Sequence, residues 1–203
     1  MLVWMDADLL TRPAMPGLGP YRRRDYDALP DLPRHQLVFG RLYVNPSPTV
    51  RHQIVVQVLC QHLERIAKAS GGIVFQAPSD VILADHSIVQ PDLAYVSATR
   101  LEVLGKWIEG PPDLVVEILS PSTARLDRGK KLDLYAMYGV QECWLVDHEP
   151  RQIEFLVNEG GRFVAVPPVK GKYRSRMLPE IQLDLPRFWR QVDTWLLRLP
   201  SSR

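Results

Sequence analysis

Two acidic residues lie inside largely apolar stretches of this sequence, where an unpaired charge is costly. Glu117 interrupts the run LVVEIL at residues 114–119, and Asp92 lies in the run IVQPDLAYV at residues 88–96. Apolar runs of this length are typical of strands buried on both faces of a sheet. A buried carboxylate needs a cation, a metal or hydrogen-bond donors to offset its desolvation. Both acids are therefore candidates for chemistry.

Carboxylates on neighbouring strands can converge, because paired strands lie about 4.8 Å apart. If the strands of Asp92 and Glu117 are neighbours, their oxygens suit a hard cation such as Mg²⁺, with Mn²⁺ as a substitute. Such a metal polarises a phosphoryl oxygen and lowers the pKa of a bound water. We therefore expect Asp92 and Glu117 to be metal ligands in a centre for phosphodiester hydrolysis.

A nearby ammonium group would stabilise the negative charge that develops on a phosphate. The strand itself does not supply it, because the residue two positions after Glu117, on the same strand face, is Leu119. Lys130 and Lys131 follow on a helix predicted over residues 127–138, and a crossover helix packs against its own sheet. Lys131 lies on a face flanked by leucines, whereas Lys130 is rotated by about 100° and is expected to be more exposed. Lys131 is therefore the candidate catalytic amine.

The elements that position these residues follow from hydrophobic periodicity and chain breakers. Strands are predicted over residues 73–76, 80–84, 88–96, 114–119, 142–147 and 153–157, after a hairpin over 37–44 and before a meander through 163–169. Helices are predicted over residues 50–69, 98–104, 127–138 and 185–199, with Asp127 as the N-cap of the third. The strand–helix–strand unit at the centre predicts an α/β fold with a mixed β-sheet flanked by helices.

Length and composition indicate one folded domain. The chain has 203 residues, of which 46% are hydrophobic and 24% charged, as in ordinary globular proteins that bury a core. Residues 1–34 are rich in Pro and Arg without a sustained period, so we expect an N-terminal arm followed by a single domain over residues 35–203. The net charge is only +2, so affinity for nucleic acid requires a local basic patch.

Cysteine usage and hydropathy indicate the compartment. Cys60 and Cys143 are isolated, without a CxxC pair or a ligand-spaced histidine, which indicates neither a zinc site nor a disulfide framework. No segment has the roughly 18 continuous apolar residues of a membrane span. The start of the chain carries acids and lacks a basic leader. We therefore expect a cytoplasmic protein with no membrane partner.

A resemblance to the Uma-type family of putative restriction endonucleases, in the PD-(D/E)XK nuclease superfamily, rests on four segments in order: VQPDLAYVS, PDLVVEILSPST, DRGKKLDLYAMYGV and ECWLVD. It spans roughly residues 35–185. It implies a restriction-endonuclease-like core and a magnesium-dependent phosphodiesterase site. By the family's pattern Asp92 and Glu117 are the two acids, and Lys131 replaces the lysine that the superfamily carries two residues after the second acid.

The first hairpin departs from the family's pattern. The family commonly has acids there, in a pattern like YELIDGEL, where residues 35–42 of this chain read HQLVFGRL. Gln36 and Arg41 therefore replace acids. The Gln36 carbonyl oxygen can still bind a metal, but the negative charge for a second metal is reduced. Glu64, on the first long helix, is a further candidate acid.

Each candidate also has a purely structural interpretation. Glu117 could form a structural ion pair with an arginine. Lys131 could form an ordinary surface ion pair with Asp127, four residues before it on the helix. His52 is interpreted as a helix-start residue and not as a ligand or base. The order of the motifs favours Asp92, Glu117 and Lys131 as an ancestral nuclease centre.

We therefore predict a metal-dependent DNA endonuclease in which water attacks the phosphodiester in line. Asp92 and Glu117 would bind the metal, and Lys131 would orient the water or stabilise the developing charge. Two alternatives stay open: a catalytically weak or inactive nucleic-acid-binding module of the same fold, favoured by Gln36 and Arg41, and an RNA or nucleotide phosphodiesterase. Analogy with enzymes that cleave both strands of DNA predicts a homodimer.

Overall fold

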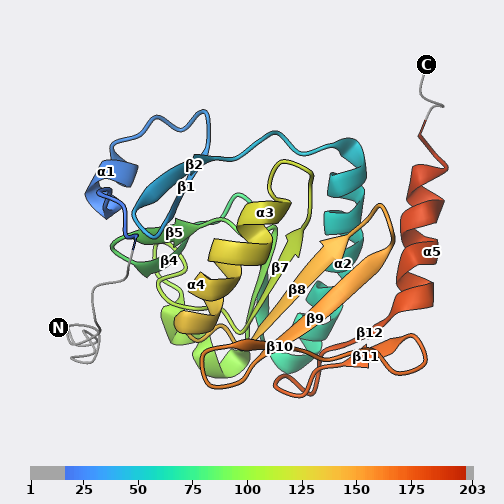
Figure 1. Cartoon of the computed structure of the whole chain (residues 1–203). Helices are drawn as coiled ribbons and strands as arrows, with labels where there is room; N and C mark the ends of the chain where they lie inside the picture. The colour runs from blue at the N-terminus through green and yellow to red at the C-terminus, as the bar shows by residue number, and fades with distance from the viewer. Residues whose placement is uncertain (1–16, 200–203) are drawn as a thin grey trace.

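The computed structural model describes residues 17–199. In chain order its elements are α1 (Arg23–Asp27), β1 (His35–Val38), β2 (Arg41–Val44), α2 (Val50–Ser70), β3 (Ile73–Gln76), β4 (Val81–Ala84), β5 (Ser87–Val89), β6 (Leu93–Val96), the 3-10 helix η2 (Ala98–Val103), β7 (Leu114–Ile118), α3 (Ala124–Leu126), the π-helix η3 (Asp127–Lys131), α4 (Leu132–Met137), β8 (Glu142–Asp147), β9 (Gln152–Asn158), β10 (Phe163–Ala165), β11 (Lys172–Arg174), β12 (Gln182–Asp184) and α5 (Leu185–Leu196) (Figure 1).

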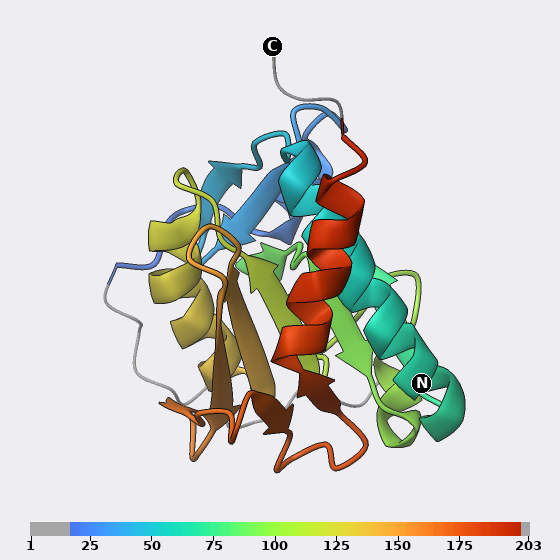
Figure 2. The same cartoon turned by 90° about the vertical axis from the view of Figure 1, so that its right-hand side faces the viewer.

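A six-stranded sheet in the order β10-β9-β8-β7-β6-β3 forms the centre. Within the described residues β7 and β8 run parallel, and the other neighbouring pairs of this sheet are antiparallel. Parallel strands need a crossover connection, which α3, η3 and α4 provide. Figure 2 shows this crossover on one face of the sheet and α2 and α5 on the other. The predicted α/β fold, with a mixed sheet flanked by helices, is confirmed.

Strand β7 is apolar because it contributes to a core on each face of the sheet. All of its residues are buried. Val116 and Ile118 pack in the core under α2 and α5, whereas Val115 packs in the core under α4. Alternation along the strand therefore turns Glu117 towards the crossover helix.

The predicted single strand over residues 88–96 is wrong, because the chain passes there from one sheet to another. β5 belongs to a four-stranded sheet in the order β2-β1-β5-β4, whereas β6 belongs to the central sheet. Pro91 has no amide hydrogen for a strand ladder, and the Gln90 amide donates to the side-chain oxygen of Gln36 (3.0 Å). Asp92 consequently lies at the junction of the two sheets and not inside a strand.

The predicted N-cap at Asp127 is also wrong. The crossover helix begins at Ala124, and the Asp127 amide already donates to the carbonyl of Thr123 (3.0 Å). The chain enters the helix through a turn in which the Ser120 hydroxyl accepts the Thr123 amide (3.2 Å). Asp127 is thus an interior helical residue, and its side chain contacts Lys131 instead of capping the helix.

The other long elements agree with the predictions apart from small changes at their ends. Thr49 caps α2 by accepting the His52 amide (3.2 Å), and Gly71 ends it with a positive φ of 80°. Of the predicted arm, residues 1–16 lie outside the described part of the chain, whereas the Tyr26 hydroxyl on α1 donates to the His35 carbonyl at the start of β1 (3.2 Å).

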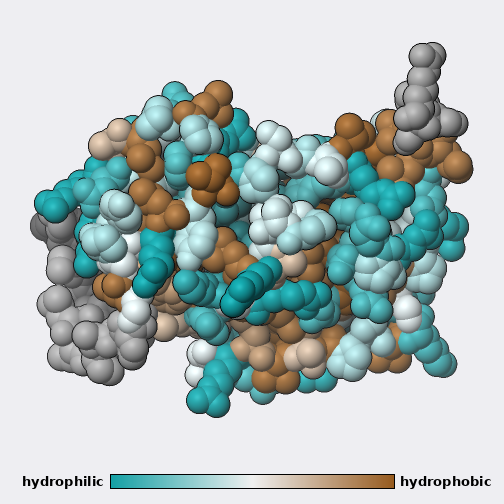
Figure 3. Space-filling model, turned by 45° about the horizontal axis from the view of Figure 1, so that its top comes forward, coloured by the Kyte–Doolittle hydropathy of each residue, from teal (hydrophilic) through white to brown (hydrophobic). Residues whose placement is uncertain are grey.

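Hydrophilic residues cover most of the face seen in Figure 3, while hydrophobic groups gather beside α1 and the β1–β2 hairpin and at the C-terminal end of α5. Within residues 17–199, no helix has both the length and the apolar character needed to cross a membrane.

Glu142, the first residue of β8, is a fully buried acid that is not one of the predicted site residues. It accepts hydrogen bonds from Trp144 Nε1 (2.6 Å), from the Tyr173 hydroxyl (2.8 Å) and from the Ser175 hydroxyl. Burial raises the pKa of Glu142 above its ordinary 4.5, although the three donors oppose this shift. Ionisation of Glu142 therefore weakens the fold.

A group whose pKa is raised by folding stabilises the fold below its unfolded pKa, and that stabilisation is lost as the pH rises through the folded pKa. The wild-type free energy of unfolding should therefore fall, relative to that of Glu142→Gln, as the pH rises above 4.5. Urea unfolding over a series of pH values measures this difference. Glu159→Gln, which changes an exposed acid in the β9–β10 turn, is the control; the same trend in both variants would refute the assignment to Glu142.

Candidate active site

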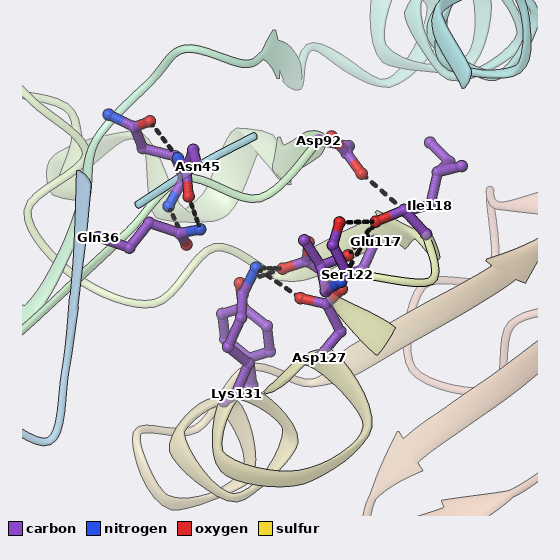
Figure 4. Close-up of polar contacts among 12 residues, drawn as sticks. Gln36, Asn45, Asp92, Glu117, Ile118, Ser122, Asp127 and Lys131 are labelled. Carbon is purple, nitrogen blue, oxygen red and sulfur yellow. Dashed lines mark hydrogen bonds and ion pairs between the residues drawn. The ribbon is translucent and has the colours of Figure 1, made fainter. Parts of the chain in front are cut away.

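Lys131 turns inward from the crossover helix and reaches the carboxylate of Glu117. Its Nζ lies 2.6 Å from Glu117 Oε1 and 3.1 Å from Asp127 Oδ1 (Figure 4). Only 2% of the Lys131 side chain and 5% of the Glu117 side chain are exposed. Lys130, in contrast, is exposed and donates to the Tyr43 hydroxyl (2.9 Å). The lysine that meets the buried acid is therefore Lys131.

The residues on one face of the crossover helix surround the carboxylate of Glu117. Asp127, Lys131 and Tyr135 are spaced four residues apart, so their side chains follow one another along that face. The Tyr135 hydroxyl donates to Glu117 Oε1 (2.5 Å), the same oxygen that Lys131 contacts. The turn that leads to Lys131 is π-helical, an irregularity frequent at functional sites. The sequence predicted the pairing of Asp127 with Lys131 only as a surface ion pair, whereas both side chains are buried. It assigned no role to Tyr135, although the four-residue spacing from Lys131 was a usable signal.

The pairing of β6 with β7 brings Asp92 across from Glu117. The two strands are antiparallel and pair Leu93 with Val116. Asp92 immediately precedes Leu93 and Glu117 immediately follows Val116, so the two acids face each other one position further along. The two acids, distant along the chain, are therefore neighbours in the fold.

Both carboxylate oxygens of Asp92 have partners. Oδ2 accepts the backbone amide of Ile118 (2.7 Å), and Oδ1 lies 3.0 Å from His52 Nε2; Figure 4 shows the Asp92 carboxylate pointing towards Ile118. The Asp92 side chain is 21% exposed, so it lies on the solvent side of the buried pair. His52, on the first turn of α2, was interpreted as a helix-start residue only; its contact with Asp92 had no signal in the sequence.

Three acids act on one buried amine. Burial raises the pKa of Glu117 above its ordinary value; the charge of Lys131 opposes this shift, and Asp127 and Asp92 reinforce it. Burial alone would lower the pKa of Lys131, but Glu117, Asp127 and Asp92 outweigh it and raise the pKa above its usual value. The two directions are compatible, because the acids around the amine carry more negative charge than it can neutralise. Lys131 therefore stays an ammonium ion.

The two departures in the first hairpin contribute no carboxylate. Gln36 is buried, and its side-chain oxygen accepts the Gln90 amide (3.0 Å) while Nε2 donates to Asn45 Oδ1 (2.5 Å). Asn45 in turn donates to Gln90 Oε1 (2.9 Å), which closes the network. Arg41 is exposed, and its guanidinium group donates to the Gly17 carbonyl (3.4 Å). The Gln36 oxygen is thus already engaged.

The oxygens of Asp92 and Glu117 are the ligand type that a hard cation prefers. Among residues 17–199, no three His, Cys, Asp or Glu side chains cluster closely enough to hold a metal ion by themselves. Glu64, the further candidate acid, is exposed on α2 and hydrogen-bonded to Cys60. Mg²⁺ commonly binds one or two carboxylates and keeps water at its other positions. In the type of their atoms the two carboxylates match what Mg²⁺ takes from a protein, and in the structure they are engaged by the Ile118 amide and His52 at Asp92 and by Lys131 and Tyr135 at Glu117.

Comparison with known proteins places the chain among nuclease-like folds. The family model Uma2, described as a putative restriction endonuclease, matches residues 23–189, and the chain belongs to this family. A putative nuclease belonging to DUF820 from Anabaena variabilis has a similar crystal structure, with a TM-score of 0.71 and 17% sequence identity, covering 85% of this chain and 99% of that one. At this identity the likeness is one of fold. No curated protein matches the chain by sequence.

The buried pair predicts an asymmetry between two adjacent lysines. Lys131→Met leaves Glu117 and Asp127 buried without their amine and should lower the free energy of unfolding by about 3–5 kcal/mol. Lys130→Met changes an exposed lysine and should alter it by no more than about 0.5 kcal/mol. Urea unfolding at neutral pH gives both values, and Glu117→Gln added to Lys131→Met should recover part of the loss. Equal losses in the two lysine variants would contradict the buried contact.

Proposed function

We propose that this protein is a metal-dependent endonuclease that hydrolyses phosphodiester bonds in DNA. The observation that supports this most directly is the buried contact between Lys131 and Glu117, at the end of the sheet where Asp92 also lies. Membership of a family described as putative restriction endonucleases supports the nuclease class. The metal, the substrate and the roles of the residues are our proposal.

In this mechanism Asp92 and Glu117 would hold Mg²⁺, for which Mn²⁺ could substitute. The cation would act as a Lewis acid that polarises a phosphoryl oxygen and lowers the pKa of a water molecule. Lys131 donates hydrogen bonds, either to the attacking water or to the phosphate oxygens on which negative charge develops. The raised pKa of Lys131 argues against its acting as a general base, because the amine retains its proton.

The neighbours of the centre fix its geometry before substrate binds. The Ile118 amide and His52 restrain the carboxylate of Asp92. Tyr135 restrains Glu117, and burial together with the charge of Glu117 raises the pKa of Tyr135, which keeps its hydroxyl a donor. Restrained side chains lose little freedom when substrate arrives, which favours catalysis.

Purified protein with Mg²⁺ or Mn²⁺ should nick supercoiled plasmid. Glu117→Gln should lower the rate by at least about 100-fold, because it removes a charged ligand of the cation that would stabilise the transition state. Glu64→Gln, at an exposed acid on α2, is the matched control and should retain the rate. Gel electrophoresis of the plasmid follows the reaction. If wild type and Glu117→Gln nick the plasmid at the same rate, the activity comes from a contaminant.

A nucleic-acid-binding module with weak or no catalysis is the second candidate. The first hairpin carries no acid, which favours this candidate. Gln36 binds the Gln90 amide with its side-chain oxygen, and Arg41 is exposed. The two candidates differ in whether a metal binds at Asp92.

Under the endonuclease proposal, Mg²⁺ at about 100 times its dissociation constant should stabilise the protein by about 2.7 kcal/mol. Asp92→Asn should remove this gain, because it removes a charged ligand, whereas Asp133→Asn, at an exposed acid of α4, should not. Thermal unfolding and titration calorimetry measure both. An absence of heat and of stabilisation in the wild type would favour the binding module.

The same centre can act on any phosphodiester, so an RNA or nucleotide phosphodiesterase is a further alternative. Comparison of DNA, RNA and small nucleotide diesters as substrates separates these. Cleavage of both strands of a duplex would suit a homodimer, and sedimentation of the purified protein measures that state.

A further inference from the structure

A groove of about 970 Å³ runs along the outer side of the crossover helix, between the β1–β2 turn and the β9–β10 turn. We call it the crossover groove, and its lining includes Phe39, Arg41, Lys130, Met137, Arg162 and Phe163. Lys130 projects into it from the residue next to Lys131, rotated by about 100° around the helix. The groove is therefore separate from the buried centre but begins one residue away from it.

The rim of the crossover groove is basic. Arg41, Lys130 and Arg162 are exposed, and within residues 17–199 none of them forms an ion pair. Arg128 also lines the groove, paired with an acid of β9. Asp133 is the one acid among these lining residues. The chain as a whole is nearly neutral, so this concentration of unpaired cations is local, and it favours a polyanion.

The interior of the crossover groove is apolar and partly aromatic. Phe39 and Phe163 are half-buried and pack against the core under α4. Cations that follow a phosphate chain beside rings on which bases stack are the combination that binds single-stranded nucleic acid. A second cavity, about 510 Å³ between α2, β12 and α5, is lined by Glu180 and Asp184 as well as by arginines. Its mixed charge does not select a polyanion.

We propose that the crossover groove binds a single-stranded stretch of nucleic acid, with phosphates along Arg41, Lys130 and Arg162 and a base against Phe163. The binding proposal rests on the proposed nuclease function in one respect: it takes the bound nucleic acid to be the substrate. Because Lys130 and Lys131 are consecutive, a strand in the groove flanks the centre in which the reacting phosphate would lie.

The test measures binding without cleavage, by fluorescence anisotropy of a labelled single-stranded oligonucleotide in the absence of divalent metal. The triple variant Arg41→Gln, Lys130→Gln and Arg162→Gln should bind more weakly, and the slope of log affinity against log salt should decrease by about 2, since each phosphate contact on a single strand contributes about 0.7. The control triple Arg65→Gln, Lys68→Gln and Arg187→Gln removes the same charge from α2 and α5 and should keep the wild-type slope.

Phe163→Leu keeps an apolar side chain but removes the ring, and should weaken binding by about fivefold or more without changing the salt slope. Equal loss of slope in both triple variants, tighter binding of a duplex of the same sequence, or no binding of the single strand would each overturn the inference. The binding assay contains no divalent metal and does not report cleavage, so it tests the groove independently of the plasmid-nicking assay. If nicking depends on Glu117 but both triple variants bind the oligonucleotide equally, the groove proposal is refuted and the nuclease proposal stands.

Discussion

The buried contact between Lys131 and Glu117 explains why the crossover helix and the central strand are placed as they are. β7 is covered on both faces, so a carboxylate at its centre must be neutralised from within the protein. The amine that does so comes from the crossover, which must therefore present Lys131 to the sheet. The parallel pairing of β7 with β8 and the four-residue spacing along the helix serve this one contact.

The remainder of the candidate centre is assembled from the other layers of the fold. The chain leaves the four-stranded sheet after β5, and this break places Asp92 directly before β6, at the junction of the two sheets. α2 brings His52 to the same carboxylate from the opposite face. Asp92 thus stays partly exposed while Glu117 is buried, so one acid lies at the surface of the site and the other within it. This arrangement leaves one side of the pair of acids open to water.

The sequence predicted what depends on local pattern. Strand and helix periods gave the order of the elements, and the phase of the crossover helix distinguished Lys131 from Lys130. Asp127 was misjudged because an acid near the start of a helical pattern has the same local signature whether it caps the helix or pairs with a lysine one turn later. The contact of His52 with Asp92 joins residues 40 positions apart, and no local pattern encodes such a contact.

The amine and the acid of the central pair belong to different elements, joined by the turn at Ser120–Thr123. Each residue inserted within the helix between Ala124 and Lys131 would turn the lysine by about 100° and shift it by about 1.5 Å relative to the start of the helix, so the lysine would leave its partner even though strand and helix both survived. The connection between β6 and β7 has no such angular requirement, because strand pairing alone sets the positions of the two acids. Natural variation in length should therefore accumulate between Asp92 and Glu117 and be scarce within the helix between Ala124 and Lys131.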